Sequence, residues 1–242
     1  MKKTKVEYFG KDLEAMDHAE NYHQWIFSLI KPYLGKNLVE VGAGTGTFSK
    51  LLLGVNPVSL FLIEPSDMYE KLAGNISEIS GETAFACFQD LFRNVADVIK
   101  KEKEPDSIIY INVLEHIQDD ENELEIVHRT LAKDGRLCIF VPAQQFLYSD
   151  FDRSIGHFRR YKKNELADKC RAAGFKILMA RNFDLPGILP WFIKYRLLKS
   201  TTMEQSLTSV YDKYAVPVAK WLESRIHPPI GKNLLVVAAK SQ

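Results

Sequence analysis

Seven short apolar runs, separated by amphipathic stretches, dominate the pattern of hydrophobic and polar positions along the chain. The run Ser59-Leu-Phe-Leu-Ile is continuous, which is typical of a parallel strand covered on both faces. Between the runs, apolar residues recur every three or four positions, as they do in helices. This alternation predicts an α/β protein with helices on both faces of a mostly parallel, doubly wound sheet. The expected strands are 37–42, 58–63, 83–88, 107–112, 135–141, 175–183 and 233–240.

Polar residues and glycines indicate where the intervening helices begin and end. Ser66 is expected to cap the helix after the second strand. Asp120 and Glu123 form an acidic variant of a capping box and predict a helix start there. Gly174 is the expected C′ residue of the helix before the sixth strand.

Composition and charge narrow the class of protein. The 242 residues carry a formal net charge of +1, so no overall field attracts nucleic acid. The three cysteines form no Cys-x-x-Cys pair, which predicts buried free thiols in a reducing compartment. The N-terminus lacks the apolar core of a secretory signal, and no apolar run has the length of a membrane span. We therefore expect a cytoplasmic protein without stable membrane insertion.

Three alternating glycines follow the first expected strand directly. Without side chains, Gly42, Gly44 and Gly46 allow backbone amides to approach a ligand, and the next helix adds N–H donors and partial positive charge. A dinucleotide fingerprint would need its third glycine at Thr47, which disfavours a nicotinamide-dependent oxidoreductase. Glu40 would repel a pyrophosphate but suits a ligand with an ammonium and a sulfonium. A tight turn without a ligand is the alternative.

A second carboxylate ends the second expected strand. Glu64 lies 24 residues after Glu40, which leaves room for one helix and a returning strand. A carboxylate at this place in a doubly wound sheet can accept hydrogen bonds from both ribose hydroxyls. The alternative is a solvated residue at the end of a strand.

These features resemble motif I and the second-strand acidic residue of class I S-adenosylmethionine-dependent methyltransferases. The resemblance covers about residues 36–185 and the last strand, and implies a Rossmann-like, seven-stranded sheet whose antiparallel last strand lies beside the fifth. It also implies S-adenosyl-L-methionine as cofactor, with Asp90 near the adenine amino group. The cofactor-binding residues that it implies are Glu40, Gly42, Ala43, Gly44, Gly46, Glu64, Pro65, Asp90, Leu91, Asn112 and Val113.

The resemblance further implies the organisation of a single methyltransferase domain. We expect an N-terminal helical cover over 1–36 and a cofactor-binding core over 37–185. A helical cap insertion is expected over 186–232, between strands six and seven, and the last strand over 233–242.

The loop after the fifth strand contains a block similar to one found in a subgroup of bacterial methyltransferases, Gly156-His-Phe-Arg-Arg-Tyr. Its position opens on the same crevice as the glycine loop. We expect His157 to act as general base, and Arg159, Arg160 and Tyr161 to bind an acidic or hydroxyl-bearing acceptor. In the alternative, Asp–Arg pairs fold this loop, with Asp150 or Asp152 paired to Arg159.

Aromatic residues of the insertion, including Trp191 and Tyr195, are expected to contact an acceptor with a hydrophobic body. The same segment could instead lie at a membrane interface. His116 is assigned to the acceptor site, with a structural role as the alternative. Metal-using relatives have a carboxylate where this chain has Asn112, and Glu115 and His116 alone are too few ligands. We therefore expect no metal ion.

The resulting functional prediction is methyl transfer from S-adenosyl-L-methionine to a small-molecule acceptor, as O- or N-methylation by in-line displacement. One alternative is a non-catalytic protein that binds S-adenosyl-L-methionine. The other is a methyltransferase for a lipid-linked or quinone acceptor at a membrane surface. Nucleic acid is not an expected partner, and the sequence leaves the acceptor and the oligomeric state open.

Overall fold

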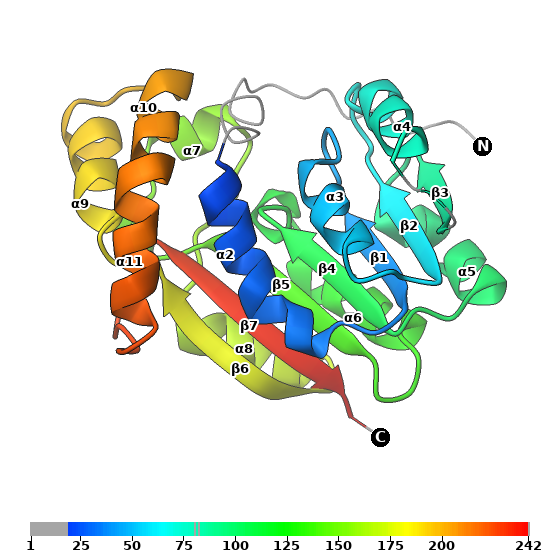
Figure 1. Cartoon of the computed structure of the whole chain (residues 1–242). Coiled ribbons are helices and arrows are strands. Elements are labelled where there is room, and N and C mark those ends of the chain that lie inside the picture. Colours follow the sequence, from blue (N-terminus) through cyan, green and yellow to red (C-terminus); the bar gives the residue numbers. More distant parts are fainter. Residues whose placement is uncertain (1–18, 80, 82, 242) are drawn as a thin grey trace.

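The fold is built around one seven-stranded mixed sheet (Figure 1). The computed structural model describes residues 19–79, 81 and 83–241, so the first half of the expected N-terminal helical cover lies outside the described residues. The strand order is β3-β2-β1-β4-β5-β7-β6. The strands are β1 (Asn37–Val41), β2 (Ser59–Ile63), β3 (Ala84–Phe88), β4 (Ser107–Ile111), β5 (Arg136–Pro142), β6 (Phe175–Phe183) and β7 (Asn233–Lys240).

The predicted sheet is confirmed, and each expected strand agrees with the observed one to within one residue at either end. Strands β1 to β5 pair in parallel, whereas β7 runs antiparallel to both β5 and β6. The antiparallel last strand beside the fifth, which rested on resemblance alone, is therefore also confirmed.

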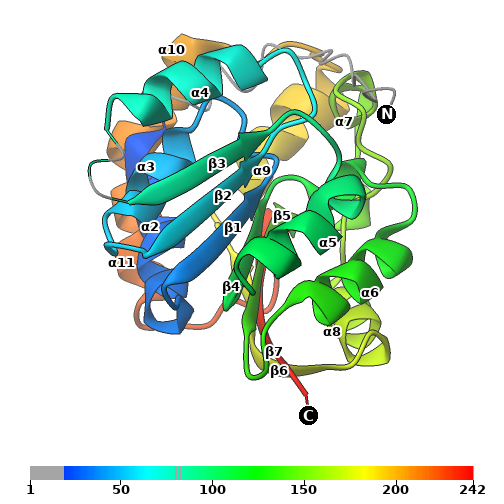
Figure 2. The same cartoon turned by 90° about the vertical axis from the view of Figure 1, so that its right-hand side faces the viewer.

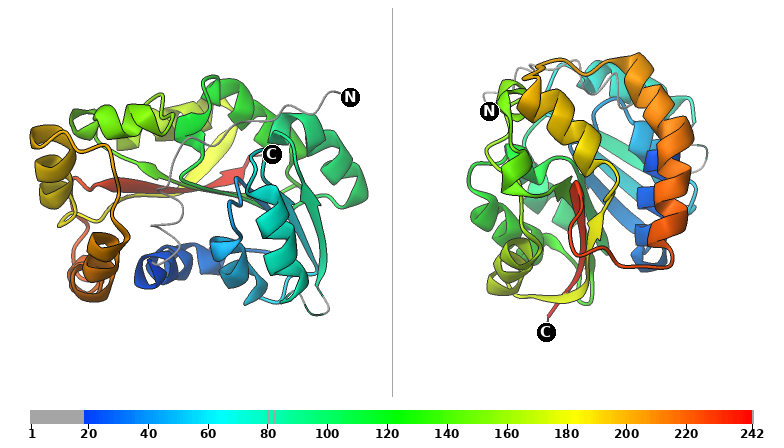
Figure 3. Two further views of the ribbon diagram at one scale, coloured as in Figure 1. Left: turned by 90° about the horizontal axis from the view of Figure 1, so that it is seen from above. Right: turned by 90° about the vertical axis from the view of Figure 1, so that its left-hand side faces the viewer.

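Helices cover both faces of the sheet, as Figures 2 and 3 show. One layer contains α2 (Glu20–Ile30), α3 (Thr47–Leu53), α4 (Tyr69–Ser77) and α11 (Val216–Glu223). The other contains α5 (Phe92–Glu102), α6 (Asp120–Thr130) and α8 (Lys163–Ala172). Each layer packs on the sheet through its own apolar cluster, because every central strand buries side chains on both faces.

Two of the helix caps predicted from sequence are wrong, although α6 begins at Asp120 as expected. The N-cap of α6 is Asp119, whose carboxylate accepts the Asn122 amide hydrogen; Asp120 and Glu123 instead make tertiary contacts, so the predicted capping box does not form. Helix α4 begins at Tyr69 without a side-chain cap, and Ser66 forms a turn just before it. The expected C′ glycine is confirmed, since Gly174 follows α8 with φ +93°.

The segment between β6 and β7 is helical. It contains α9 (Ile188–Trp191), the π-helical turn η4 (Phe192–Leu197), α10 (Gln205–Val210), a second π-helical turn η5 (Tyr211–Ala215) and α11. We call 186–232 the cap. Cys138 and Cys170 are buried free thiols, as expected, whereas the free thiol of Cys87 is only partly buried. Among the described residues, no helix combines the length and the apolar character that a membrane crossing requires.

A buried carboxylate fastens the cap to the sheet. Asp184, in the turn after β6, is fully buried and accepts hydrogen bonds from the Tyr22 hydroxyl at 3.2 Å and the Tyr211 hydroxyl at 2.5 Å. It also accepts the Gly187 amide hydrogen at 3.1 Å and pairs with the Lys232 ammonium at 2.8 Å. Tyr22 belongs to α2 and the other three partners belong to the cap, so this side chain at the end of β6 joins α2 and the cap.

Replacing this carboxylate should destabilise the protein strongly. In Asp184→Ala the Lys232 ammonium loses its counter-charge, and we expect the free energy of unfolding to fall by about 3–5 kcal/mol. Urea unfolding measures the loss. The control is Asp168→Ala, which breaks the exposed contact with Arg171 and should cost less than about 1 kcal/mol. Equal losses in the two variants would contradict a central role for Asp184.

Candidate functional site

The glycine loop is held against the end of β2 by Glu64. One carboxylate oxygen accepts the Gly44 amide hydrogen at 2.8 Å, and the other accepts the Ser66 amide hydrogen at 2.9 Å. Gly42 has φ +71°, and a Cβ there would lie 2.3 Å from a methyl group of Val113. The loop therefore packs directly on the turn after β4. It lies between β1 and β4, where the strand order of the sheet changes direction.

Glu40 lies beneath this loop, near the end of β1. Its side chain is buried and accepts a 2.5 Å hydrogen bond from the Ser49 hydroxyl of α3. The pKa of Glu40 is raised to about 8, mainly by burial and to a smaller extent by the nearby charge of Glu64, and the Ser49 hydrogen bond opposes the rise. A cation at this position would be attracted to the ionised form of Glu40.

The remaining predicted cofactor residues lie along the same edge, at the carboxyl ends of β1 to β4. Asp90 follows β3, and its carboxylate accepts the Leu91 amide hydrogen and a hydrogen of the Asn94 side chain. Asn112 ends β4 in the left-handed region, at φ +54°, a conformation that asparagine tolerates. The structure thus brings together the residues that the sequence assigned to the cofactor: Glu40, Gly42, Ala43, Gly44, Gly46, Glu64, Pro65, Asp90, Leu91, Asn112 and Val113.

The loop after β5 is organised by the buried carboxylate of Asp152, in helix α7 (Asp150–Ser154). Its side chain forms a capping box with Ser149 and pairs with the Arg160 guanidinium at 2.7 Å. The same oxygen lies 3.1 Å from Nδ1 of His157. Asp152 therefore fixes both the orientation of the imidazole and the course of the loop.

The two arginines of this loop have separate carboxylate partners. Arg160 is buried, and its guanidinium lies over the Trp191 ring at 4.6 Å. Arg159 pairs with Asp120 at 2.7 Å, and Asp120 also accepts the hydroxyl hydrogen of Tyr161. Asp–Arg pairs therefore do fold this loop, as the sequence-based alternative expected. The partner of Arg159, however, is Asp120 of α6 and not Asp150 or Asp152, and Asp152 pairs with Arg160 instead.

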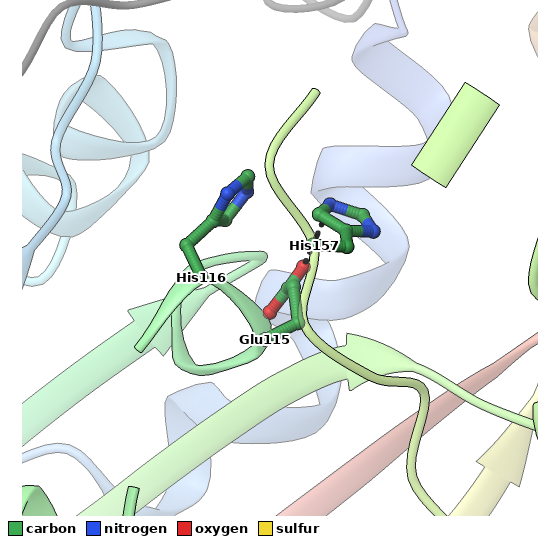
Figure 4. A group of neighbouring side chains, drawn as sticks. All are labelled: Glu115, His116 and His157. Atoms are coloured by element: carbon green, nitrogen blue, oxygen red, sulfur yellow. Dashed lines mark ion pairs between the residues drawn. The ribbon is translucent and has the colours of Figure 1, made fainter. Parts of the chain in front are cut away.

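Three side chains from two segments converge beside the glycine loop. Glu115 and His116 belong to the turn η2 (Leu114–His116) after β4, and His157 comes from the facing loop (Figure 4). Their ligand atoms lie within 4.8 Å of one another. Nε2 of His157 is 3.7 Å from a Glu115 oxygen, and the rings of His116 and His157 meet edge to face with centroids 4.5 Å apart.

The electrostatics of this cluster follow from burial. Glu115 is fully buried and neither carboxylate oxygen has a hydrogen-bond partner within the described part of the chain, so desolvation raises its pKa to about 7. Burial, followed by the nearby His157, lowers the pKa of His116 to about 3, so the imidazole is neutral. The sequence-based argument against a metal ion considered only Glu115 and His116 as ligands. It did not place His157 beside them, because no spacing in the sequence relates His157 to the other two residues.

A mostly apolar cavity of about 790 Å³ lies in the cap and against the start of α2. Trp191 and Tyr195, both predicted to contact the acceptor, line it. Their rings lie against each other with centroids 4.3 Å apart and a tilt of 40°, and both pack on Phe151 of α7. The cavity and the loop that carries His157 therefore share one aromatic wall.

Comparisons with known proteins agree with this geometry. Residues 14–180 match the family described as methyltransferase domain. Among curated proteins, the sequence has no match. One similar solved structure is the Burkholderia thailandensis 1,6-didemethyltoxoflavin-N1-methyltransferase with bound 1,6-didemethyltoxoflavin and S-adenosylhomocysteine. It is 16% identical, the match covers 96% of this chain and 82% of that chain, and the TM-score is 0.60.

Two further solved structures show how widely this fold is used. A possible histamine N-methyltransferase from Thermotoga maritima is 16% identical over 96% of this chain and 95% of that chain, with a TM-score of 0.57. The [4+2]-cyclase SpnF is 16% identical over 91% of this chain and 80% of that chain, also with a TM-score of 0.57. At these identities the likeness concerns the fold alone. The match to the family, however, spans more than half of the sequence, and the chain therefore belongs to the methyltransferase domain family, the class I S-adenosylmethionine-dependent methyltransferases.

Proposed function

We propose that the protein transfers the methyl group of S-adenosyl-L-methionine to a small-molecule acceptor. The observation that carries this proposal is the bond between Gly44 and Glu64, which joins a glycine loop to a strand-end carboxylate at the switch point of the sheet. The cofactor would lie across this edge, with its ribose hydroxyls on Glu64 and its adenine near Asp90 and Leu91. Its ammonium group would face Glu40.

The methyl acceptor would lie between the glycine loop and the loop after β5, next to Glu115, His116 and His157. In the transfer, a lone pair of the acceptor forms a bond to the methyl carbon while the carbon–sulfur bond breaks, and S-adenosylhomocysteine leaves. A hydroxyl acceptor also loses its proton. With Nδ1 held by Asp152, His157 presents Nε2 to this position, and that nitrogen can accept a proton or bind a metal ion.

The acceptor would carry an apolar body that occupies the cap cavity beside Trp191 and Tyr195. Arg159 is partly exposed, so it is the arginine that can reach an acidic group of the acceptor. Arg160 and Tyr161 are buried, and we assign them the role of holding the loop in place. This differs from the sequence-based expectation, which gave both residues to acceptor binding.

Removing the strand-end carboxylate should weaken cofactor binding. Glu64→Ala loses up to two charge-assisted hydrogen bonds to the ribose, worth about 1.5–3 kcal/mol each, and releases the Gly44 amide. Calorimetric titration with S-adenosylhomocysteine measures the change. The control is Glu70→Ala, an exposed carboxylate of α4 that should leave the affinity unchanged. An unaltered affinity in the Glu64 variant would show that the ligand does not lie on this edge.

Cofactor binding should release a proton from Glu40. Its pKa of about 8 means that this carboxyl group is mostly neutral at pH 7, and a cationic ligand favours the ionised form. The affinity for S-adenosyl-L-methionine should therefore rise with pH up to about 8. Calorimetry in two buffers of different protonation enthalpy measures the released protons. In Glu40→Gln this release should disappear; if it persists unchanged, the proton comes from another group.

The transfer rate should depend on His157. In a panel of hydroxyl- and amine-bearing apolar acceptors, including a quinol offered with and without lipid vesicles, the release of S-adenosylhomocysteine identifies the acceptor class. With the best acceptor, His157→Ala should lower the rate by about 10²–10⁴-fold at unchanged cofactor affinity. The exposed His227 provides the control, and His227→Ala should behave like the wild type. A loss below tenfold in the His157 variant would remove this residue from the chemistry.

A further inference from the structure

We propose that Glu115, His116 and His157 bind one divalent transition-metal ion beside the methyl acceptor. Over residues 19–79, 81 and 83–241, this is the group whose three ligand atoms approach one another closely enough to share an ion. The existence of the site follows from the cluster itself. Its part in catalysis rests on the proposed methyl transfer.

The buried carboxylate of Glu115 points to a missing cation. Buried polar atoms in proteins nearly always have a hydrogen-bond partner, yet both Glu115 oxygens lack one. Nε2 of His157 is 3.7 Å from one of these oxygens, too far for a hydrogen bond. Two ligands of a tetrahedral ion, each roughly 2.1 Å from it, lie roughly 3.4 Å apart, so this gap is close to the separation that a shared ion requires.

His157 is already oriented as a ligand. Nδ1 of His157 is bonded to Asp152, which leaves Nε2 directed toward Glu115. A carboxylate on the second ring nitrogen is the usual support of a metal-bound histidine, because it fixes the tautomer and the ring. Asp152 is itself held by Arg160 and Ser149. The ring of His116 packs edge to face on that of His157, with centroids 4.5 Å apart, which restrains it.

The chemical nature of these three ligands indicates which metal ions the site would bind. Two imidazoles and one carboxylate suit Zn²⁺, Fe²⁺, Co²⁺ or Mn²⁺, whereas Mg²⁺ and Ca²⁺ prefer oxygen ligands. Three protein ligands leave a position open for an acceptor oxygen. Bound there, a hydroxyl would lose its proton to water more readily, and the resulting oxygen would attack the methyl carbon as the carbon–sulfur bond breaks. This reverses the sequence-based expectation of no metal and makes His157 a ligand instead of a base.

Cobalt binding to the whole protein tests the site without any acceptor. After removal of metal by a chelator, Co²⁺ should bind at one ion per chain and give a visible absorption band, which Zn²⁺ should displace. His157→Ala and Glu115→Gln should each weaken Co²⁺ binding at least tenfold, whereas the control His227→Ala should not. Asp152→Asn should weaken it by about 10–100-fold, since Asp152 only positions His157.

Titration with S-adenosylhomocysteine shows whether each variant is folded, because its binding residues do not belong to the cluster. The proposal is overturned if the wild type gives no Co²⁺ band, or if variants that bind S-adenosylhomocysteine normally also bind Co²⁺ like the wild type. Failure of S-adenosylhomocysteine to bind the wild type would instead overturn the proposed methyl transfer, and Co²⁺ binding would still be measured independently.

Discussion

The loop after β5, where we propose that the acceptor lies, depends on one buried carboxylate. Asp152 accepts from the Arg160 guanidinium, lies against the His157 ring and caps its own short helix. Breaking such a buried pair leaves an uncompensated charge, so the three contacts form or fail together. Because Arg160 also lies over Trp191, the same carboxylate connects the cluster of Glu115, His116 and His157 to the wall of the cap cavity.

The fold could be predicted from the sequence because its signals are local. A strand buried on both faces, such as β2, has an unbroken run of apolar residues in the sequence. The end of α8 is indicated by the glycine that follows it. The Gly42 loop and Glu64 were also predictable, since each lies at the end of a strand whose position was clear. Which residue caps a helix was not predictable where tertiary contacts decide it. Asp120 could cap α6, but its bonds to Arg159, Lys169 and Tyr161 leave the cap to Asp119.

The candidate site was predictable only on its cofactor side. Those residues follow consecutive parallel strands, and the order of the strands places them together. On the acceptor side, the approach of His157 to Glu115 depends on how the loop after β5 folds, which is decided by Asp152 and by the hydrogen bond from the Phe158 amide to the Glu115 carbonyl. Similar folds that carry out methyl transfer and a [4+2] cyclisation show that the sheet alone does not decide the acceptor chemistry.

The position of β7 also has a consequence for how the chain folds during synthesis. Among the strands that the structure describes, β6 pairs only with β7, which itself lies between β6 and β5. Until residues 233–240 have left the ribosome, β6 has no neighbour in the sheet and β5 exposes one edge. Strands β1 to β5 can assemble earlier, because they pair among themselves. The half of the sheet that supports the cap is therefore completed last, after a pairing over a long stretch of sequence that carries a high cost in chain entropy.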